Sequence, residues 1–93
     1  MMGQIRGEQE TLGSMLLSKA TIADVIDVLR VDDFRHPAHR LIFDCIIGLY
    51  RRGQPADPVT VTMELARTGD LFSVGGAAYL HTLISLVPVR EVS

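Results

Sequence analysis

The chain has 93 residues, a length that fits a single compact domain. Hydrophobic residues make up 47% of it and charged residues 22%, as in most soluble globular proteins. Nine basic and eleven acidic side chains give a net charge of −2, which excludes the strongly basic surface of many nucleic-acid-binding proteins. The single cysteine, Cys45, excludes an internal disulfide and a cysteine-rich zinc site. It fits a reducing compartment, and the start of the chain lacks the pattern of a secretory signal, so we expect a cytoplasmic protein.

The first third of the chain predicts two helices. Apolar side chains recur at helical spacing over residues 8–17, and acidic side chains stand in the first turn, where the helix dipole favours them. Before this helix, residues 1–7 are expected to form a flexible start that can include residues left from cloning. The same spacing predicts a second helix over residues 22–30, with Thr21 as its N-cap.

A third helix is predicted from Pro37 to about Arg52, because proline suits the first helical position and Gly53 suits the end. Its interior is apolar on nearly every side: Leu41, Ile42, Phe43, Cys45, Ile46, Ile47, Leu49 and Tyr50. A helix with so little polar surface is usually surrounded by others, so we interpret it as the central helix of the domain. Cys45 lies within it and is expected to be a small core residue rather than a nucleophile.

Two further helices are predicted in the second half of the chain. Asp57 and Pro58 form the N-cap and the first residue of a helix that ends at Gly69. Three apolar residues share one of its faces: Val59, Met63 and Ala66. The glycine pair at residues 75–76 opens the last helix, which Pro88 ends. Its expected buried stripe is Leu80, Leu83, Ile84 and Val87.

The region of the last helix carries no formal charge over 19 positions, residues 71–89, close to the ~20 that a membrane-spanning helix needs. The glycine pair, His81 and Pro88 interrupt this run, so a membrane span is not expected. A helix on a monomer's surface normally carries charges on its outer face, and this one has none. Three of its residues are left to face away from the buried stripe: Tyr79, Thr82 and Leu86. Because interface cores favour uncharged aromatic and aliphatic side chains, we expect these three to form a protein interface.

The residues that usually carry catalysis or bind cofactors and metals do not form a recognisable set here. The phosphate-binding patterns G-x-x-x-x-G-K-[ST] and G-x-G-x-x-G are both absent. His36 and His39 are spaced like a pair of metal ligands, but zinc needs two or more further ligands, so a cap or a buried hydrogen bond is the better interpretation. No catalytic, cofactor-binding or metal-binding residue is therefore expected. Two predicted helices joined by a short connection, residues 59–68 and 76–87, leave open a weaker alternative, a helix-turn-helix DNA-binding protein. The second of these helices, however, has no lysine or arginine that could contact the edges of the bases.

Seven short stretches of the chain carry a family resemblance: EQETLG at residues 8–13, MLL at 15–17, DF at 33–34, PAHRLIF at 37–43, LYRRGQP at 49–55, VT at 59–60 and VGGAAYL at 74–80. In this order and spacing they resemble the N-terminal domain of the DnaB-type replicative DNA helicases, over nearly the whole chain. Two departures stand out. Arg35 and His36 follow Phe34, where the family often has an aromatic residue, and the residues after Pro88 differ from the family's usual continuation.

This resemblance implies an all-α fold, a small compact orthogonal bundle of about five to six helices. It implies one helical head domain over residues 8–88, with residues 89–93 beginning a linker or a helical hairpin. In that family the head associates with its neighbours to form the collar of a hexameric helicase. It also docks primase and, in some systems, the helicase loader. The expected neighbour of the uncharged face is then a second protomer or the hairpin.

The resemblance also implies that the motor of the helicase lies elsewhere. In this family ATP and Mg²⁺ act in a separate RecA-like C-terminal domain, so the parent protein is expected to be an ATP-dependent helicase while this chain alone is not an enzyme. No cofactor, no sequence-specific DNA binding and no membrane binding are expected of the chain itself. The alternative is a free-standing helical adaptor or regulator that has the same head without the motor.

Overall fold

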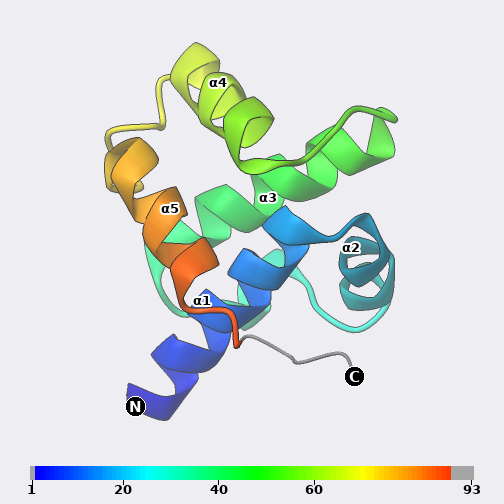
Figure 1. Cartoon of the computed structure of the whole chain (residues 1–93), viewed down its shortest axis with the longest axis vertical. Helices are drawn as coiled ribbons and strands as arrows, with labels where there is room; N and C mark the ends of the chain where they lie inside the picture. The colour runs from blue at the N-terminus through cyan, green and yellow to red at the C-terminus, as the bar shows by residue number, and fades with distance from the viewer. Residues whose placement is uncertain (1, 89–93) are drawn as a thin grey trace.

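Five α-helices and one short 3₁₀-helix make up residues 2–88, the part of the chain that the computed structural model describes. They are α1 (Met2–Leu17), α2 (Lys19–Ile26), η1 (Val31–Asp33), α3 (Pro37–Arg51), α4 (Pro58–Thr68) and α5 (Gly76–Ser85). The helices cross one another rather than run parallel, and α3 passes through the middle of the molecule (Figure 1). The predicted all-α fold with about five to six helices is confirmed, with no strand among the described residues.

The central helix α3 forms the core, as its apolar sequence predicts. It packs against α1, α2 and α4, and seven of its residues are buried: Ala38, His39, Ile42, Phe43, Ile46, Ile47 and Leu49. Pro37 occupies the first turn and His36 is the N-cap, with its Nδ1 accepting the Ala38 N–H at 3.1 Å. Cys45 is half-buried, and this burial raises the pKa of its thiol to about 11. The thiol therefore stays protonated at neutral pH, as expected of a core residue.

Two helix starts differ from the predictions made from the sequence. α1 begins at Met2, so residues 2–7 are helical rather than a flexible start. These first turns lack an apolar stripe, but an Arg6–Glu10 ion pair of 3.0 Å and the tertiary hydrogen bonds of Glu8 hold them. α2 begins at Lys19, because the Ser18 hydroxyl, and not Thr21, is the N-cap. It accepts the Thr21 N–H at 3.3 Å, and α2 ends at Ile26, before the predicted Arg30.

The start and the end of α4 are as predicted. Asp57 accepts the Thr60 N–H at 2.7 Å, Pro58 follows it, and Gly69 ends the helix in the left-handed conformation with φ 84°. Val61 and Leu65 supply its buried side. The predicted shared face of Val59, Met63 and Ala66 lies on the solvent side, where all three are exposed.

The last helix, α5, is shorter than predicted, because it ends at Ser85 rather than at Pro88. Leu80 and Leu83 are buried as expected, while Ile84 and Val87 are half-buried. No helix in residues 2–88 combines the length and the apolar character that crossing a membrane requires. The predicted linker or hairpin at residues 89–93 lies outside the described residues.

The backbones of α1 and α5 approach each other closely at Gly13. This glycine is buried, and a Cβ added to it would overlap the carbonyl oxygen of Leu83 on α5. Only a residue without a side chain allows this packing. The close contact fixes α5 against α1, and it thereby brings Tyr79 of α5 near the polar residues of α1.

Candidate protein-docking site

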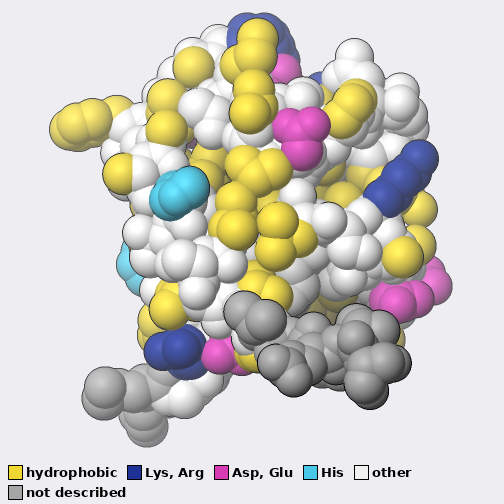
Figure 2. Space-filling view, in the orientation of Figure 1, with side chains coloured by type: hydrophobic (Ala, Val, Ile, Leu, Met, Phe, Trp, Pro, Cys, Tyr) yellow, Lys and Arg dark blue, Asp and Glu magenta, His cyan; other side chains and the backbone are white. Residues whose placement is uncertain are grey.

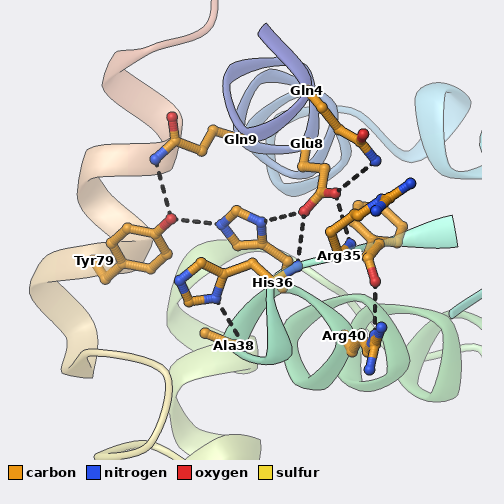
Figure 3. A network of polar contacts seen from close by, with 10 residues as sticks. Gln4, Glu8, Gln9, Arg35, His36, Ala38, Arg40 and Tyr79 are labelled. Atoms are coloured by element: carbon orange, nitrogen blue, oxygen red, sulfur yellow. Dashed lines mark hydrogen bonds and ion pairs between the residues drawn. The ribbon is translucent and has the colours of Figure 1, made fainter. Parts of the chain in front are cut away.

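A network of polar side chains joins α1, α3 and α5 at the point where these helices meet (Figure 3). His39 of α3 is at its centre and is fully buried. Its Nδ1 lies 2.7 Å from a carboxylate oxygen of Glu8, on α1, and its Nε2 lies 2.6 Å from the hydroxyl of Tyr79, on α5. Gln9, also on α1, donates its side-chain N–H to the same hydroxyl at 3.1 Å. We call these four residues the Tyr79 network.

The carboxylate of Glu8 is ionised at one end of this network. Burial alone would raise the pKa of Glu8, but hydrogen bonds from the Arg35 backbone, the His39 ring and the His36 backbone outweigh it and lower the pKa below its usual value of 4.5. The Arg35 N–H donates at 2.7 Å and the His36 N–H at 3.4 Å, both directly before α3. Glu8 therefore ties α1 to the start of α3.

The ionised carboxylate determines where the protons of the network lie. A carboxylate only accepts hydrogen bonds, so Nδ1 of His39 carries a proton and donates it to Glu8. When the imidazole is neutral, Nε2 is then an acceptor and receives the hydroxyl proton of Tyr79. The hydroxyl oxygen remains free to accept from Gln9. Each hydrogen bond of the network thus has one donor and one acceptor. No buried side-chain nitrogen or oxygen of residues 2–88 lacks a hydrogen-bonding partner.

The three residues predicted as a protein interface lie along one side of α5, spaced by three and four positions. Thr82 is exposed, and its hydroxyl bonds back to the Ala78 carbonyl at 3.1 Å. Leu86 is half-buried directly after the helix. Tyr79 is also half-buried, with its ring nearly parallel to that of His39 at an angle of 9° and a centroid distance of 5.8 Å. α5 contains no acidic or basic residue apart from His81.

The sequence did not reveal that Tyr79 is anchored through its hydroxyl. Its partners are far away in the chain, since Glu8 precedes His39 by 31 residues and Tyr79 follows His39 by 40. The one signal available was a histidine inside an otherwise apolar helix, because a buried polar group needs a hydrogen-bonding partner.

The two histidines considered as metal ligands have structural roles instead. His36 caps α3, and both ring nitrogens of His39 are engaged within the protein. Their rings pack 4.7 Å apart. Among residues 2–88, no group of three or more His, Cys, Asp and Glu side chains is arranged to hold a metal ion. The interpretation of these histidines as a cap and a buried hydrogen-bonding residue is confirmed.

A second apolar surface lies around α4 and the turn that leads into α5. Val59 and Met63 of α4 are 69% and 67% exposed, and Phe72 in the turn is 96% exposed. A shallow groove between α4 and α5 is lined partly by Val59, Met63 and Ala77. Figure 2 shows apolar side chains gathered over the middle and the upper part of this view, with charged groups mostly towards its rim. The exposure of Phe72 had no signal in the sequence.

A family model described as the DnaB-like helicase N terminal domain matches residues 2–92 of the chain. The chain belongs to this family. The replicative DNA helicase DnaB of Mycobacterium leprae (strain TN) is 58% identical over 84 residues, which cover 90% of this chain and 14% of the relative. The replicative DNA helicase DnaB of Geobacillus stearothermophilus is 39% identical over 84 residues, which cover 90% of this chain and 18% of the relative.

The fold of this DnaB-family chain also matches a solved structure. A crystal structure of the N-terminal domain of DnaB helicase from Mycobacterium tuberculosis superposes with a TM-score of 0.88 at 58% identity. The match covers 90% of this chain and 58% of that one. The resemblance inferred from the seven short stretches is therefore confirmed. The chain spans less than a fifth of the length of the two curated helicases.

Proposed function

We propose that this chain is the N-terminal assembly and docking domain of a replicative DNA helicase. In this role it forms part of the collar of the hexamer and binds primase and, in some systems, the helicase loader. ATP and Mg²⁺ are then needed only by a separate motor domain, and the chain by itself neither turns over ATP nor unwinds DNA. The chain does not recognise a particular DNA sequence, and it acts in the cytoplasm.

The observation that carries the proposal is the uncharged outer side of α5. Tyr79 and Thr82 lie along it and Leu86 directly follows it; the three range from half-buried to exposed, and the helix has no acidic residue, lysine or arginine. The cores of protein interfaces are depleted of charge and enriched in aromatic side chains. An outer face of this kind is suited to burial against another protein, and membership of a helicase family supports a second helicase subunit as that protein. Primase is the further partner that the family resemblance implies.

The experiment measures binding of the purified chain to primase by isothermal titration calorimetry, and its self-association by sedimentation velocity. Thr82→Glu places a charge on the proposed face at an exposed position, so it leaves the core intact. The matched control is Val28→Glu, because Val28 is an exposed aliphatic residue in the turn two positions after the end of α2. Thr82→Glu should weaken primase binding at least about tenfold, since a desolvated unpaired charge costs more than 1.4 kcal/mol.

Val28→Glu should bind primase as the wild type does. Two results would reject the proposal: no measurable binding of the wild-type chain to primase and no self-association, or equal affinity of the wild type and Thr82→Glu. The first would reject a docking role, and the second would reject the α5 face as its location.

A further inference from the structure

The solvent side of α4 carries a row of apolar side chains that continues into the turn before α5. Val59, Met63 and Ala66 are spaced by four and three positions, so they share one side of the helix, and all three are exposed. Phe72, in the turn, is almost completely exposed. We call these four residues the α4 face. A contiguous apolar patch of this kind marks an interaction surface.

The α4 face combines a projecting side chain with two shallow hollows. The groove between α4 and α5 is lined partly by Met63 and Ala77, and a second hollow beside Phe72 is lined partly by Ala66 and Gly76. The hollows adjoin, because Ala66 follows Met63 on the same side of α4 and Gly76 directly precedes Ala77. In Figure 2 an apolar group projects at the left edge, where Figure 1 has the turn between α4 and α5.

The chemistry of the groove suits an apolar occupant. The hydroxyl of Thr62 donates to the Pro58 carbonyl at 2.6 Å, so its proton is already used within α4. Among the described residues that line the groove, His81 is the one that can ionise. A site for a small polar molecule usually presents several convergent polar groups. An uncharged side chain such as that of Phe72 fits this lining better.

The charge of α4 permits contact with an identical helix. α4 contains one acidic and one basic residue, Glu64 and Arg67, and they form an ion pair of 2.7 Å. Arg52 of α3 lies 3.4 Å from the same carboxylate. Like charges that face each other oppose association, and an oppositely charged partner is selected only by a charged surface. Because α4 has no net charge, two copies of it meet without repulsion.

The size of the α4 face determines the strength of its contact. A stable interface covers about 800 Å² on each partner, and one aromatic side chain supplies roughly 150–250 Å² of that area. One aromatic and three smaller apolar side chains fall short of it, so the contact is weak by itself. Weak contacts become effective between subunits that other contacts hold together. In a closed ring each subunit has two neighbours and needs two contact faces, and the α5 face is only one.

We propose that the α4 face is a two-fold contact between two copies of this chain, in which Phe72 of each copy lies in the groove between α4 and α5 of the other. The contact is two-fold because the projecting ring and the groove belong to one face, which is then self-complementary. This inference rests on the assembly role in the proposed function and adds a second subunit contact to it. Primase takes no part in it.

The test is self-association of the purified chain, measured by sedimentation equilibrium from about 10 μM to about 1 mM. Phe72→Ser removes the projecting ring, and Met63→Glu places a charge in the groove. Both positions are exposed, so the core stays intact. The matched controls are Val28→Ser and Val28→Glu, because Val28 is similarly exposed and follows α2, on the other side of the molecule from the turn before α5 (Figure 1).

The wild type and both Val28 variants should form the same weak dimer. Phe72→Ser and Met63→Glu should each weaken it at least about tenfold, because a two-fold contact contains every substitution twice. A mixture of copies with ¹³C-labelled methionine methyl groups and unlabelled copies then locates the contact by NMR. A nuclear Overhauser effect should join the labelled Met63 methyl group to aromatic protons of an unlabelled copy, and it should vanish in Phe72→Ser.

Three results would overturn the inference. A wild-type chain that stays monomeric at about 1 mM has no such contact, and primase binding then decides separately whether the proposed function holds. A dimer that resists Phe72→Ser and Met63→Glu but is lost in Thr82→Glu places the subunit contact on α5, so the proposed function stands and the α4 contact is wrong. A dimer without the signal from Met63 also rejects the proposed arrangement.

Discussion

Gly13→Ala should destabilise the domain, although alanine is the better helix former. The added Cβ would overlap the Leu83 carbonyl oxygen, and it would lie 2.9 Å from the Leu83 carbonyl carbon and 2.7 Å from a methyl group of Val87. Ordinary contacts between carbon atoms begin at about 3.5 Å, so α1 and α5 must separate by about 1 Å. The obstacle is backbone of a packed helix, which cannot rotate away as a flexible side chain can.

The magnitude follows from two opposing effects. Forcing an extra methyl group into a packed core typically costs about 1–3 kcal/mol, and a collision with backbone lies at the upper end. Alanine in place of glycine within a helix offsets this by about 1 kcal/mol. We therefore expect Gly13→Ala to lower the free energy of unfolding by at least about 1 kcal/mol.

Gly7→Ala is the matched control on the same helix, because a Cβ at Gly7 meets no atom within 4 Å. It should raise the free energy of unfolding by up to about 1 kcal/mol, since only helix propensity changes. Both variants are compared by urea denaturation followed by circular dichroism at the helix band. If Gly13→Ala is as stable as Gly7→Ala, α1 and α5 do not pack against each other at Gly13. The position of α5 described above is then wrong.

Three further predictions concern the hydrophobic core, the carboxylate of Glu8, and ATP hydrolysis and zinc binding. Ile46 is fully buried, so Ile46→Ala should lower the free energy of unfolding by about 2–5 kcal/mol, and a loss under about 1 kcal/mol would place it outside the core. Because folding lowers the pKa of Glu8 from 4.5, the stability that its carboxylate provides is complete above that pH and is lost as the pH falls below it. The melting temperature of the wild type should thus fall more steeply than that of Glu8→Gln between about pH 5 and pH 3, and parallel curves would contradict the role of Glu8. The purified chain should hydrolyse no ATP and hold no stoichiometric zinc, and one zinc per chain in elemental analysis would revive His36 and His39 as ligands.

The features that the sequence predicts well are those that depend on neighbouring residues. Pro37, the Asp57–Pro58 pair and Gly69 define helix ends through their own backbone geometry, and the structure places these ends where they were predicted. The helical character of α3 and its central place also follow from the sequence, because its apolar residues leave almost no polar side.

The features that it predicts poorly depend on tertiary contacts or on a choice between similar local signals. Ser18 and Thr21 are both acceptable N-caps, and only the path of the chain after α1 decides for Ser18. Residues 2–7 are helical partly because Glu8 is held by the chain before α3, which no local pattern records. Tyr79 lies on the predicted face of α5, but its partners on α1 and α3 appear only once those helices are packed.

The central claim, that α5 presents the docking face, is tested most directly by mapping the contact surface. ¹⁵N-labelled chain is titrated with unlabelled primase, and the changes in the backbone amide signals are followed residue by residue. The largest changes should lie along α5 and directly after it, at Tyr79, Thr82 and Leu86. The amide signals of α2 should not shift. Changes concentrated on α2 and η1, with α5 unaffected, would contradict the claim.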